Sequence, residues 1–248
     1  LKEVILGEGT DKNLEAISAF SASNIGNYYI STKFAKSKES EIYKAWAWGN
    51  YKYQSKSKKN LLYVKEQKEL EFLTFYSDCI NFSRDLINSP ANKLNPSTYY
   101  SKIKNNNLFK SFNFIDYTEK EINSNFPLTC AVGKSSSSKP KVIEITNRKL
   151  SKKDKPLVII GKGVTFDTGG VNIKPGTSMR NMKKDMGGSA IAISLFLLAN
   201  YFLKKTKIVL IAPIAENAIS SKSMWPGDVY SSVSGKSVEI AHTDAEGR

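Results

Sequence analysis

Short runs rich in apolar residues recur along the chain and predict the strands of an α/β fold. Each run is bounded by polar or turn-forming residues, as buried strands usually are. A longer, nearly uniform apolar segment at residues 190–202 predicts a buried helix. The order of strand, loop, helix and strand predicts a mixed, largely parallel sheet flanked by helices, with right-handed crossovers. The predicted strands are residues 61–64, 112–117, 142–146, 157–160, 208–213 and 237–241.

Residues 1–65 are typical of part of a small α/β domain that precedes the larger one. Asp11 is placed to cap a helix, and residues 27–34 alternate weakly, like an edge strand. Residues 41–48 are rich in aromatic side chains and suit either a strand or a packed helix. The pattern alone does not separate these two alternatives.

Residues 66–90 predict a connecting helix, because their apolar positions recur near the 3.6-residue helical period. The second predicted domain is residues 91–248. A helix is expected to begin at Asn95-Pro96, where proline suits the first turn. Thr118 and Glu121 have the spacing of a capping box and predict the start of another helix.

The composition supports a folded core but leaves the partners of the chain open. The hydrophobic fraction of 40%, with 11% aromatic residues, argues against global disorder. A formal net charge of +14 is compatible with binding to nucleic acid or to an anionic surface. The lysines are scattered, however, and a solvated basic surface is the favoured interpretation.

The cysteine count and the length of the apolar runs bear on the cellular compartment of the protein and on whether it spans a membrane. Cys79 and Cys130 do not suggest a disulfide framework, so a reducing, cytoplasmic compartment is expected and both are interpreted as packing residues. No segment approaches 18 apolar residues, and neither a membrane span nor a signal peptide is expected. The first residue, Leu1, and the last, Arg248, suggest a fragment of a longer protein.

Acidic residues follow two of the predicted strands, where ligands collect in parallel sheets. Asp167 and Asp185 lie beyond the strand at 157–160, and Asp244 and Glu246 beyond the strand at 237–241. Converging carboxylates repel one another unless a cation neutralises them, which predicts a site for hard divalent ions. The plainer alternative is that Lys162 pairs with Asp167 while the acids cap loops.

The segments around these acids also resemble a known family. GKGVTFDTGGVNIKPG, MKKDMGGSA and HTDAEGR are similar to signature segments of the leucyl aminopeptidases, the cytosol aminopeptidases of peptidase family M17. SRDLINSPAN and CAVGKSSSSKPKVIEI also resemble that family. The resemblance covers residues 78–248, with no specific match before it. It implies a metallo-aminopeptidase catalytic domain truncated at its C-terminus, preceded by a partial non-catalytic domain.

The resemblance implies a dinuclear metal centre. Its implied metal ligands are Lys162, Asp167, Asp185, Asp244 and Glu246, with Asp167 and Glu246 bridging two ions. Zinc or manganese is expected, with magnesium a third option. The family's reaction is attack of a metal-bridging hydroxide on the first peptide bond of a peptide substrate, releasing the N-terminal residue, with leucine-type preference as one option.

The resemblance also implies catalytic groups and an assembly. Lys174 is the implied catalytic lysine, a cation aimed at the oxyanion of the tetrahedral intermediate. Arg248 is implied to hold a bicarbonate that acts as general base. Met182 and Ala245 match positions of the side-chain pocket, with ordinary packing as the alternative. Family members commonly form homohexamers.

The sequence departs from the family pattern at His242, where asparagine is usual. We interpret this single histidine as a neighbour that either shapes substrate preference or hydrogen-bonds the backbone. No G-x-S-x-G motif is present, which argues against a serine hydrolase. The alternatives to an aminopeptidase are a basic nucleic-acid-binding relative and an inactive scaffold subunit. By itself the 248-residue chain is expected to be poorly soluble or inactive, because part of the sheet would lie open.

Overall fold

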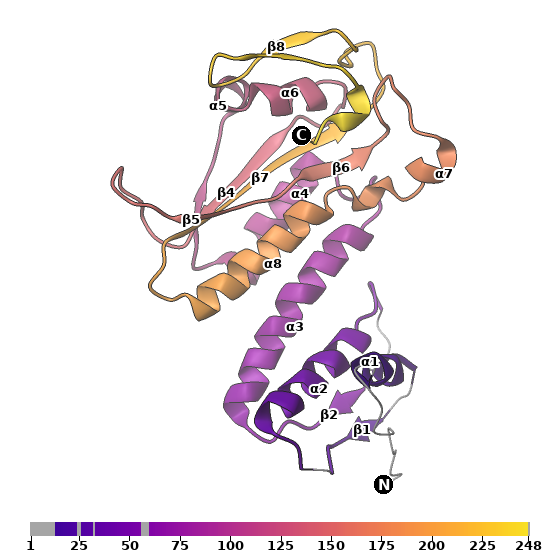
Figure 1. The fold of residues 1–248 in the computed structure, drawn as a ribbon, viewed down its shortest axis with the longest axis vertical. Helices are drawn as coiled ribbons and strands as arrows, with labels where there is room; N and C mark the ends of the chain where they lie inside the picture. The colour runs from indigo at the N-terminus through magenta and orange to yellow at the C-terminus, as the bar shows by residue number, and fades with distance from the viewer. Residues whose placement is uncertain (1–12, 24–25, 32, 56–59, 248) are drawn as a thin grey trace. The chain divides into compact units, whose positions relative to one another are not determined.

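The computed structural model describes residues 13–23, 26–31, 33–55 and 60–247. The chain divides into two compact units, residues 1–81 and 82–248. The division falls inside one helix, α3 (Gln67–Asn88), which covers almost all of the predicted connecting helix. Figure 1 shows the elements of both units, coloured in chain order.

The described residues of the first unit form two helices, two short strands and the beginning of α3. The segment that suited either a strand or a helix is helical, because Ile42, Ala45 and Trp46 face one core at helical spacing. Phe20 and Tyr28 pack their rings against Trp46. The predicted cap Asp11 lies outside the described residues. The bounds are α1 Asn13–Ser23, β1 Asn27–Tyr28, α2 Lys36–Gly49 and β2 Leu61–Leu62.

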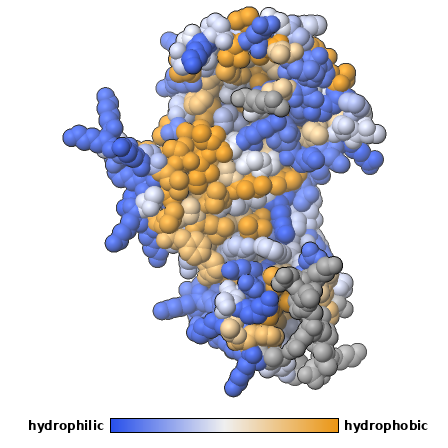
Figure 2. All heavy atoms as spheres, in the orientation of Figure 1, coloured by the Kyte–Doolittle hydropathy of each residue, from blue (hydrophilic) through white to orange (hydrophobic). Residues whose placement is uncertain are grey.

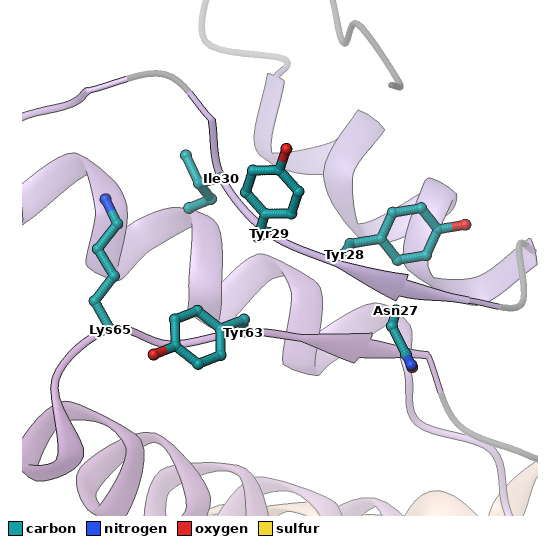
Figure 3. Close-up of a pocket in the computed structure, with 6 residues that line it drawn as sticks. All are labelled: Asn27, Tyr28, Tyr29, Ile30, Tyr63 and Lys65. Carbon is teal, nitrogen blue, oxygen red and sulfur yellow. The ribbon is translucent and has the colours of Figure 1, made fainter. Parts of the chain in front are cut away.

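The strands β1 and β2 form a two-stranded parallel sheet that is shorter than predicted. A pocket of about 430 Å³ lies beside them. Tyr29, just after β1, and Tyr63, just after β2, are among the residues that line it (Figure 3). Tyr29 is 57% exposed and Tyr63 is 64% exposed. The ammonium of Lys65, which also lines this pocket, is paired with Glu39 at 3.0 Å.

The second unit is built on a mixed sheet of five strands, which confirms the predicted fold class. The strand order is β3-β4-β7-β5, and β6 also pairs with β7. The strand β4 is antiparallel to both β3 and β7, whereas β5 and β6 are both parallel to β7. The bounds are β3 Asn113–Ile115, β4 Lys141–Thr146, β5 Leu157–Ile160, β6 Gly163–Asp167 and β7 Ile208–Asn217.

The strand β6 was not predicted from the sequence, which suggested a loop directly after β5. β5 pairs with the first half of β7 and β6 with the second half, so the two form one interrupted edge strand. At the interruption, a Cβ on Gly161 would lie 2.5 Å from the Cα of Ser189. The carbonyl of Lys162 accepts a hydrogen bond from the Ser189 N–H at 2.8 Å. The break therefore lets the first turn of a helix approach the strand.

That helix, α8 (Gly187–Phe202), packs on β5, β6 and β7 (Figure 1). Its buried side includes Ile193 and Phe196, each 0% exposed, and Tyr99 hydrogen-bonds Ser189 at 2.8 Å. The remaining helices of this unit are short. Their bounds are α4 Pro96–Lys104, η1 Asn107–Phe109, α5 Glu119–Asn125, α6 Pro127–Gly133, α7 Gly176–Met179, η2 Met182–Lys184 and η3 Thr243–Ala245.

Two local predictions of helix starts are confirmed. Asn95 caps α4 through a reciprocal capping box with Thr98, and Pro96 follows at the first helical position. Thr118 and Glu121 form the predicted capping box of α5, with the Glu121 carboxylate 2.7 Å from the Thr118 N–H. Both depend only on residues within one turn of each other.

Two predictions of burial are wrong. Three residues of β5 are substantially exposed, with Ile160 at 69%, because the described residues leave this edge uncovered. The helix α8 is also exposed along a second apolar side, formed by Ile191, Leu195 and Phe202. Figure 2 shows orange, apolar atoms gathered on the face that carries this helix.

The predicted strand at 237–241 does not join the main sheet, which corrects the expectation that it does. β9 (Ser237–Glu239) pairs antiparallel with β8 (Val229–Ser231) in a separate hairpin. Asp244 and Glu246 therefore reach the carboxyl end of the sheet from a turn after this hairpin, not from a sheet strand.

One stretch among the described residues, Met182–Phe202, meets a length and composition test for a membrane-spanning helix. Core helices of soluble domains meet the same test. In this chain its α8 part packs on three strands of the sheet.

Candidate metal centre

Three acidic residues from different segments meet at the carboxyl end of β6. Asp167 is the last residue of β6, Asp185 follows η2, and Glu246 follows η3. One carboxylate oxygen from each lies within 4.8 Å of the others. Carboxylates at this separation form a pocket of hard oxygen donors of the kind that divalent cations prefer.

Two lysines lie among these carboxylates. The Nζ of Lys162 is 2.8 Å from an oxygen of Asp185 and 2.8 Å from Oε1 of Glu246. The Nζ of Lys174 is 2.9 Å from Oδ2 of Asp167 and also contacts Asp244. Lys174 thus links Asp244 to Asp167, which is itself close to Asp185 and Glu246. All five predicted metal ligands therefore lie in one cluster.

The charges in this cluster are not balanced. Among the described residues, four carboxylates face two ammonium groups, which leaves two negative charges uncompensated within this part of the cluster. The Glu246 side chain is only 1% exposed. Burial raises the pKa of Glu246, and the nearby charge of Asp167 adds to this rise. The site therefore disfavours the ionised form of Glu246 in the absence of a further cation.

One oxygen of Glu246 provides the test of whether a cation fits. Oε2 is buried and has no hydrogen-bond or ion-pair partner among the described residues. An unpartnered buried carboxylate oxygen is costly, and a cation is a partner that removes that cost. The donor set of carboxylates and one amine suits zinc or manganese.

The pKa values of both lysines are raised. Burial lowers the pKa of Lys162, but its contacts with Asp185 and Glu246 outweigh burial. The pKa of Lys174 is raised in the same way by Asp244 and Asp167. Both ammonium groups therefore act as counter-charges in this arrangement, and a neutral Lys162 requires that a cation take over its two carboxylate partners.

A hydrogen-bond network that the sequence analysis did not identify joins the acidic segments. Asn217, at the end of β7, donates from Nδ2 to Asp167 at 2.7 Å and to the carbonyl of Thr243 at 3.1 Å. Thr243 is fully buried and donates to the carbonyl of Gly169 at 2.6 Å. Its N–H donates to Oδ1 of Asn172 at 2.9 Å. In the sequence, Asn217 lies a few residues after the predicted strand at 208–213, and that position does not by itself indicate a contact with Asp167.

The glycine pair after Asp167 allows this network to form. Gly169 and Gly170 have φ values of 88° and 66°, in the left-handed region that favours glycine. A Cβ on Gly170 would lie 2.8 Å from Oγ1 of Thr243. The close approach of these two chains therefore requires glycine at position 170.

The other predicted site residues have mixed outcomes. His242 accepts a hydrogen bond at Nδ1 from the backbone N–H of Asp244 at 3.1 Å, which is the backbone role considered for it. Met182 begins η2 and is partly buried, whereas Ala245 ends η3 and is exposed. Arg248, the predicted bicarbonate-binding residue, lies outside the described residues.

Neither cysteine has the features of a nucleophile. Cys79 and Cys130 are not disulfide-bonded, and Cys79 is 0% exposed. Burial raises the pKa of Cys79 to about 12 and also raises that of Cys130. A thiol with a raised pKa is a weak source of thiolate, which agrees with the prediction that both are packing residues.

Comparison with known proteins identifies the family. The catalytic-domain model of the cytosol aminopeptidase family matches residues 81–248. A probable cytosol aminopeptidase of Corynebacterium efficiens is 39% identical over 172 residues, which are 69% of this chain and 34% of that protein. The chain thus spans about a third of the length of this curated relative.

Solved structures share the fold. The cytosol aminopeptidase of Coxiella burnetii has a TM-score of 0.81 at 30% identity, with 94% of this chain and 53% of that chain covered. The bottromycin maturation enzyme BotP, in complex with Mn, also has a TM-score of 0.81, at 24% identity, covering 98% of this chain and 56% of the other. With a matching family model over more than half its length, this chain belongs to the cytosol aminopeptidase family.

Proposed function

We propose that this chain carries the metal-binding part of a cytosolic, dinuclear metal-dependent aminopeptidase. The observation that carries the proposal is the cluster of Asp167, Asp185 and Glu246, with ligand oxygens within 4.8 Å and one Glu246 oxygen unpartnered. Such a buried, uncompensated set is expected where cations bind. Family membership supports the same reaction class.

Five side chains are proposed to hold two divalent cations. These ligands are Lys162, Asp167, Asp185, Asp244 and Glu246. Bound there, divalent cations would supply Lewis-acid polarisation of the scissile carbonyl and would lower the pKa of a bound water molecule. The Mn complex of the structurally similar BotP supports manganese as one of the ions to test.

Lys174 is proposed to stabilise the developing oxyanion of the substrate. Its side chain is only 14% exposed, and the contacts of its ammonium with Asp244 and Asp167 raise its pKa, which keeps it charged. A preorganised cation in a site with little water stabilises transition-state charge strongly. Arg248 is proposed to hold an anion that takes the proton. Peptides with a free N-terminus are the proposed substrates, and a homohexamer is the proposed assembly.

Metal binding tests the proposal directly, because the chain covers only part of its relatives. Titration of the purified, metal-free chain with MnCl₂ or ZnCl₂ should show two bound ions that EDTA removes. Asp185→Ala should lose at least one ion, whereas Asp228→Ala, in the separate hairpin region, should lose none. If wild type binds no cation, or if Asp185→Ala retains both, the proposed centre is rejected. Metal-free chain that binds duplex DNA with a steep salt dependence would favour the nucleic-acid alternative.

A further inference from the structure

The two oxygens of Asp167 have different surroundings. Oδ1 accepts hydrogen bonds from the Gly169 N–H at 2.8 Å and from Nδ2 of Asn217 at 2.7 Å. Oδ2 lies on the side of the acidic cluster, 2.9 Å from Nζ of Lys174. One oxygen therefore faces protein N–H donors and the other faces the proposed cation site.

Oδ1 has no remaining capacity for a cation. A carboxylate oxygen has about two lone-pair positions, and two N–H donors occupy those of Oδ1. Asp167 and Asn217 are each 2% exposed as whole residues, so water does not compete for these contacts. Moving Oδ1 onto a cation would leave two buried donors without partners, which is unfavourable.

The orientation of Asn217 is determined by its partners. Its two amide contacts are to Oδ1 of Asp167 and to the carbonyl oxygen of Thr243, and both oxygens only accept. The Nδ2 group must therefore face them, because the amide oxygen could not donate to either. Asn217 is also paired with Asp167 in the β6–β7 register, and its carbonyl accepts from the Thr168 N–H at 3.0 Å. The backbone thus holds the amide in place.

We infer that Asn217 is a positioning residue that makes Asp167 a single-oxygen ligand. It keeps Oδ1 for the protein, presents Oδ2 to the cations, and through Thr243 fixes the turn that carries Asp244 and Glu246. This inference rests on the proposed metal site. The neutral Asn217 would thus control which oxygen of Asp167 binds metal. Residues that hydrogen-bond to metal ligands orient them in this way in other proteins.

Asn172 provides a matched control. Its Oδ1 accepts from the N–H of Thr243 at 2.9 Å, so it holds the same turn, but none of its hydrogen bonds among the described residues is to a carboxylate. Asn217→Ala and Asn172→Ala should therefore both loosen the turn, whereas only Asn217→Ala frees Oδ1 of Asp167. A purely structural role for Asn217 predicts equal effects of the two substitutions.

The experiment measures the Mn²⁺ affinity of metal-free wild type, Asn217→Ala and Asn172→Ala by calorimetric titration, with melting temperatures without metal as the measure of structural damage. Asn217→Ala should weaken Mn²⁺ binding about 10- to 100-fold. Asn172→Ala should weaken it about threefold or less at a similar loss of melting temperature. Equal weakening by both variants, or unchanged binding in Asn217→Ala, overturns the inference.

A second measurement needs no variant and therefore does not depend on whether Asn217→Ala folds. In crystals of wild type soaked with Mn²⁺, Oδ2 of Asp167 should contact the ion while Oδ1 keeps its two N–H donors. If Oδ1 also contacts an ion, the inference is wrong although the proposed metal site stands. If wild type binds no Mn²⁺ at all, both the proposed site and the inference fail.

Discussion

The Nζ of Lys162 lies 2.8 Å from Oε1 of Glu246, although the two residues are far apart in the sequence. A Cβ on the adjacent Gly247 would lie 2.7 Å from the same Nζ, so the turn after η3 closes tightly around the lysine. This contact brings the end of the described chain onto the break between β5 and β6. It explains why one lysine can face two acids from separate segments.

Glu246→Gln should weaken metal binding and stabilise the metal-free chain. The substitution removes a proposed ligand. Its loss should lower the metal affinity by more than the roughly 10- to 100-fold typical when only a hydrogen-bond partner of a ligand is removed. It also replaces a buried, incompletely partnered carboxylate by a neutral amide, which is less costly to bury. Mn²⁺ titration and melting temperatures without metal measure the two effects. The control is Glu239→Gln, on the exposed face of β9, which should change neither the Mn²⁺ affinity nor the melting temperature. If Glu246→Gln lowers the melting temperature of the metal-free chain, the electrostatic argument is contradicted.

Lys174→Ala should separate catalysis from metal binding. Its ammonium is proposed to stabilise the oxyanion, and removal of one such group typically lowers turnover about 10²- to 10³-fold. The metal content should remain that of wild type, because Lys174 is not a proposed ligand. Hydrolysis of an amino-acid arylamide, measured with this segment in the context of its full-length protein, and elemental analysis provide the two readouts. Lys236→Ala, in the β8–β9 hairpin, is the control, and undiminished turnover in Lys174→Ala would remove the proposed role.

Gly170→Ala should destabilise the chain by about 1–3 kcal/mol. The residue has a φ of 66°, and an added Cβ would lie 2.8 Å from Oγ1 of Thr243. The strain should also displace the turn that carries Asp244 and weaken Mn²⁺ binding. Gly176→Ala is a matched control, because a Cβ there would meet nothing within 4 Å. Urea unfolding of both variants tests the difference, and equal stabilities would show that the contact relaxes without cost.

Two neighbouring leucines of α8 test its two apolar sides. Leu195 is 52% exposed and Leu197 is 1% exposed. Leu195→Gln should change the free energy of unfolding by less than about 0.5 kcal/mol, as exposed substitutions usually do. Leu197→Gln should cost about 2–5 kcal/mol, because it removes core packing and buries an amide. Leu195→Gln should also raise the solubility of the chain, measured by the concentration that stays in solution. A large loss of stability in Leu195→Gln would mean that this side of α8 is covered.

Asp154 should contribute a pH-dependent part of the stability. Hydrogen bonding to Lys207, at 2.6 Å, and to Ser151 lowers the pKa of Asp154 to about 2. A carboxylate with a lowered pKa in the folded state stabilises the fold above its unfolded pKa of about 3.8, and this contribution is lost as pH falls toward 2. The difference in melting temperature between wild type and Asp154→Asn should therefore be constant above about pH 4 and shrink below it. A Lys207→Gln background should reduce the difference at neutral pH, and a difference that persists unchanged at pH 2 would contradict the assignment.

Local signals in the sequence predicted much of this chain correctly. Asn95 and Thr118 mark helix starts because a cap requires only residues within the next turn. The strand at residues 208–213 was recognised from its apolar run, although the structure extends it to Asn217. The acidic residues were also expected to lie together, and they do, whereas their binding of metal stays a prediction.

Only the tertiary structure determined which residues are buried and which side chains hydrogen-bond to one another. The apolar run of β5 predicted a buried strand, but Ile160 is exposed, because burial depends on what packs against a strand and not on its own residues. Nothing near Asn217 in the sequence indicated its contact with Asp167, which arises because β6 and β7 run side by side. The sequence determined which chemical groups this protein has and where its helices begin. The fold determined which of those groups touch, because contacts between distant segments depend on the packing of the whole unit.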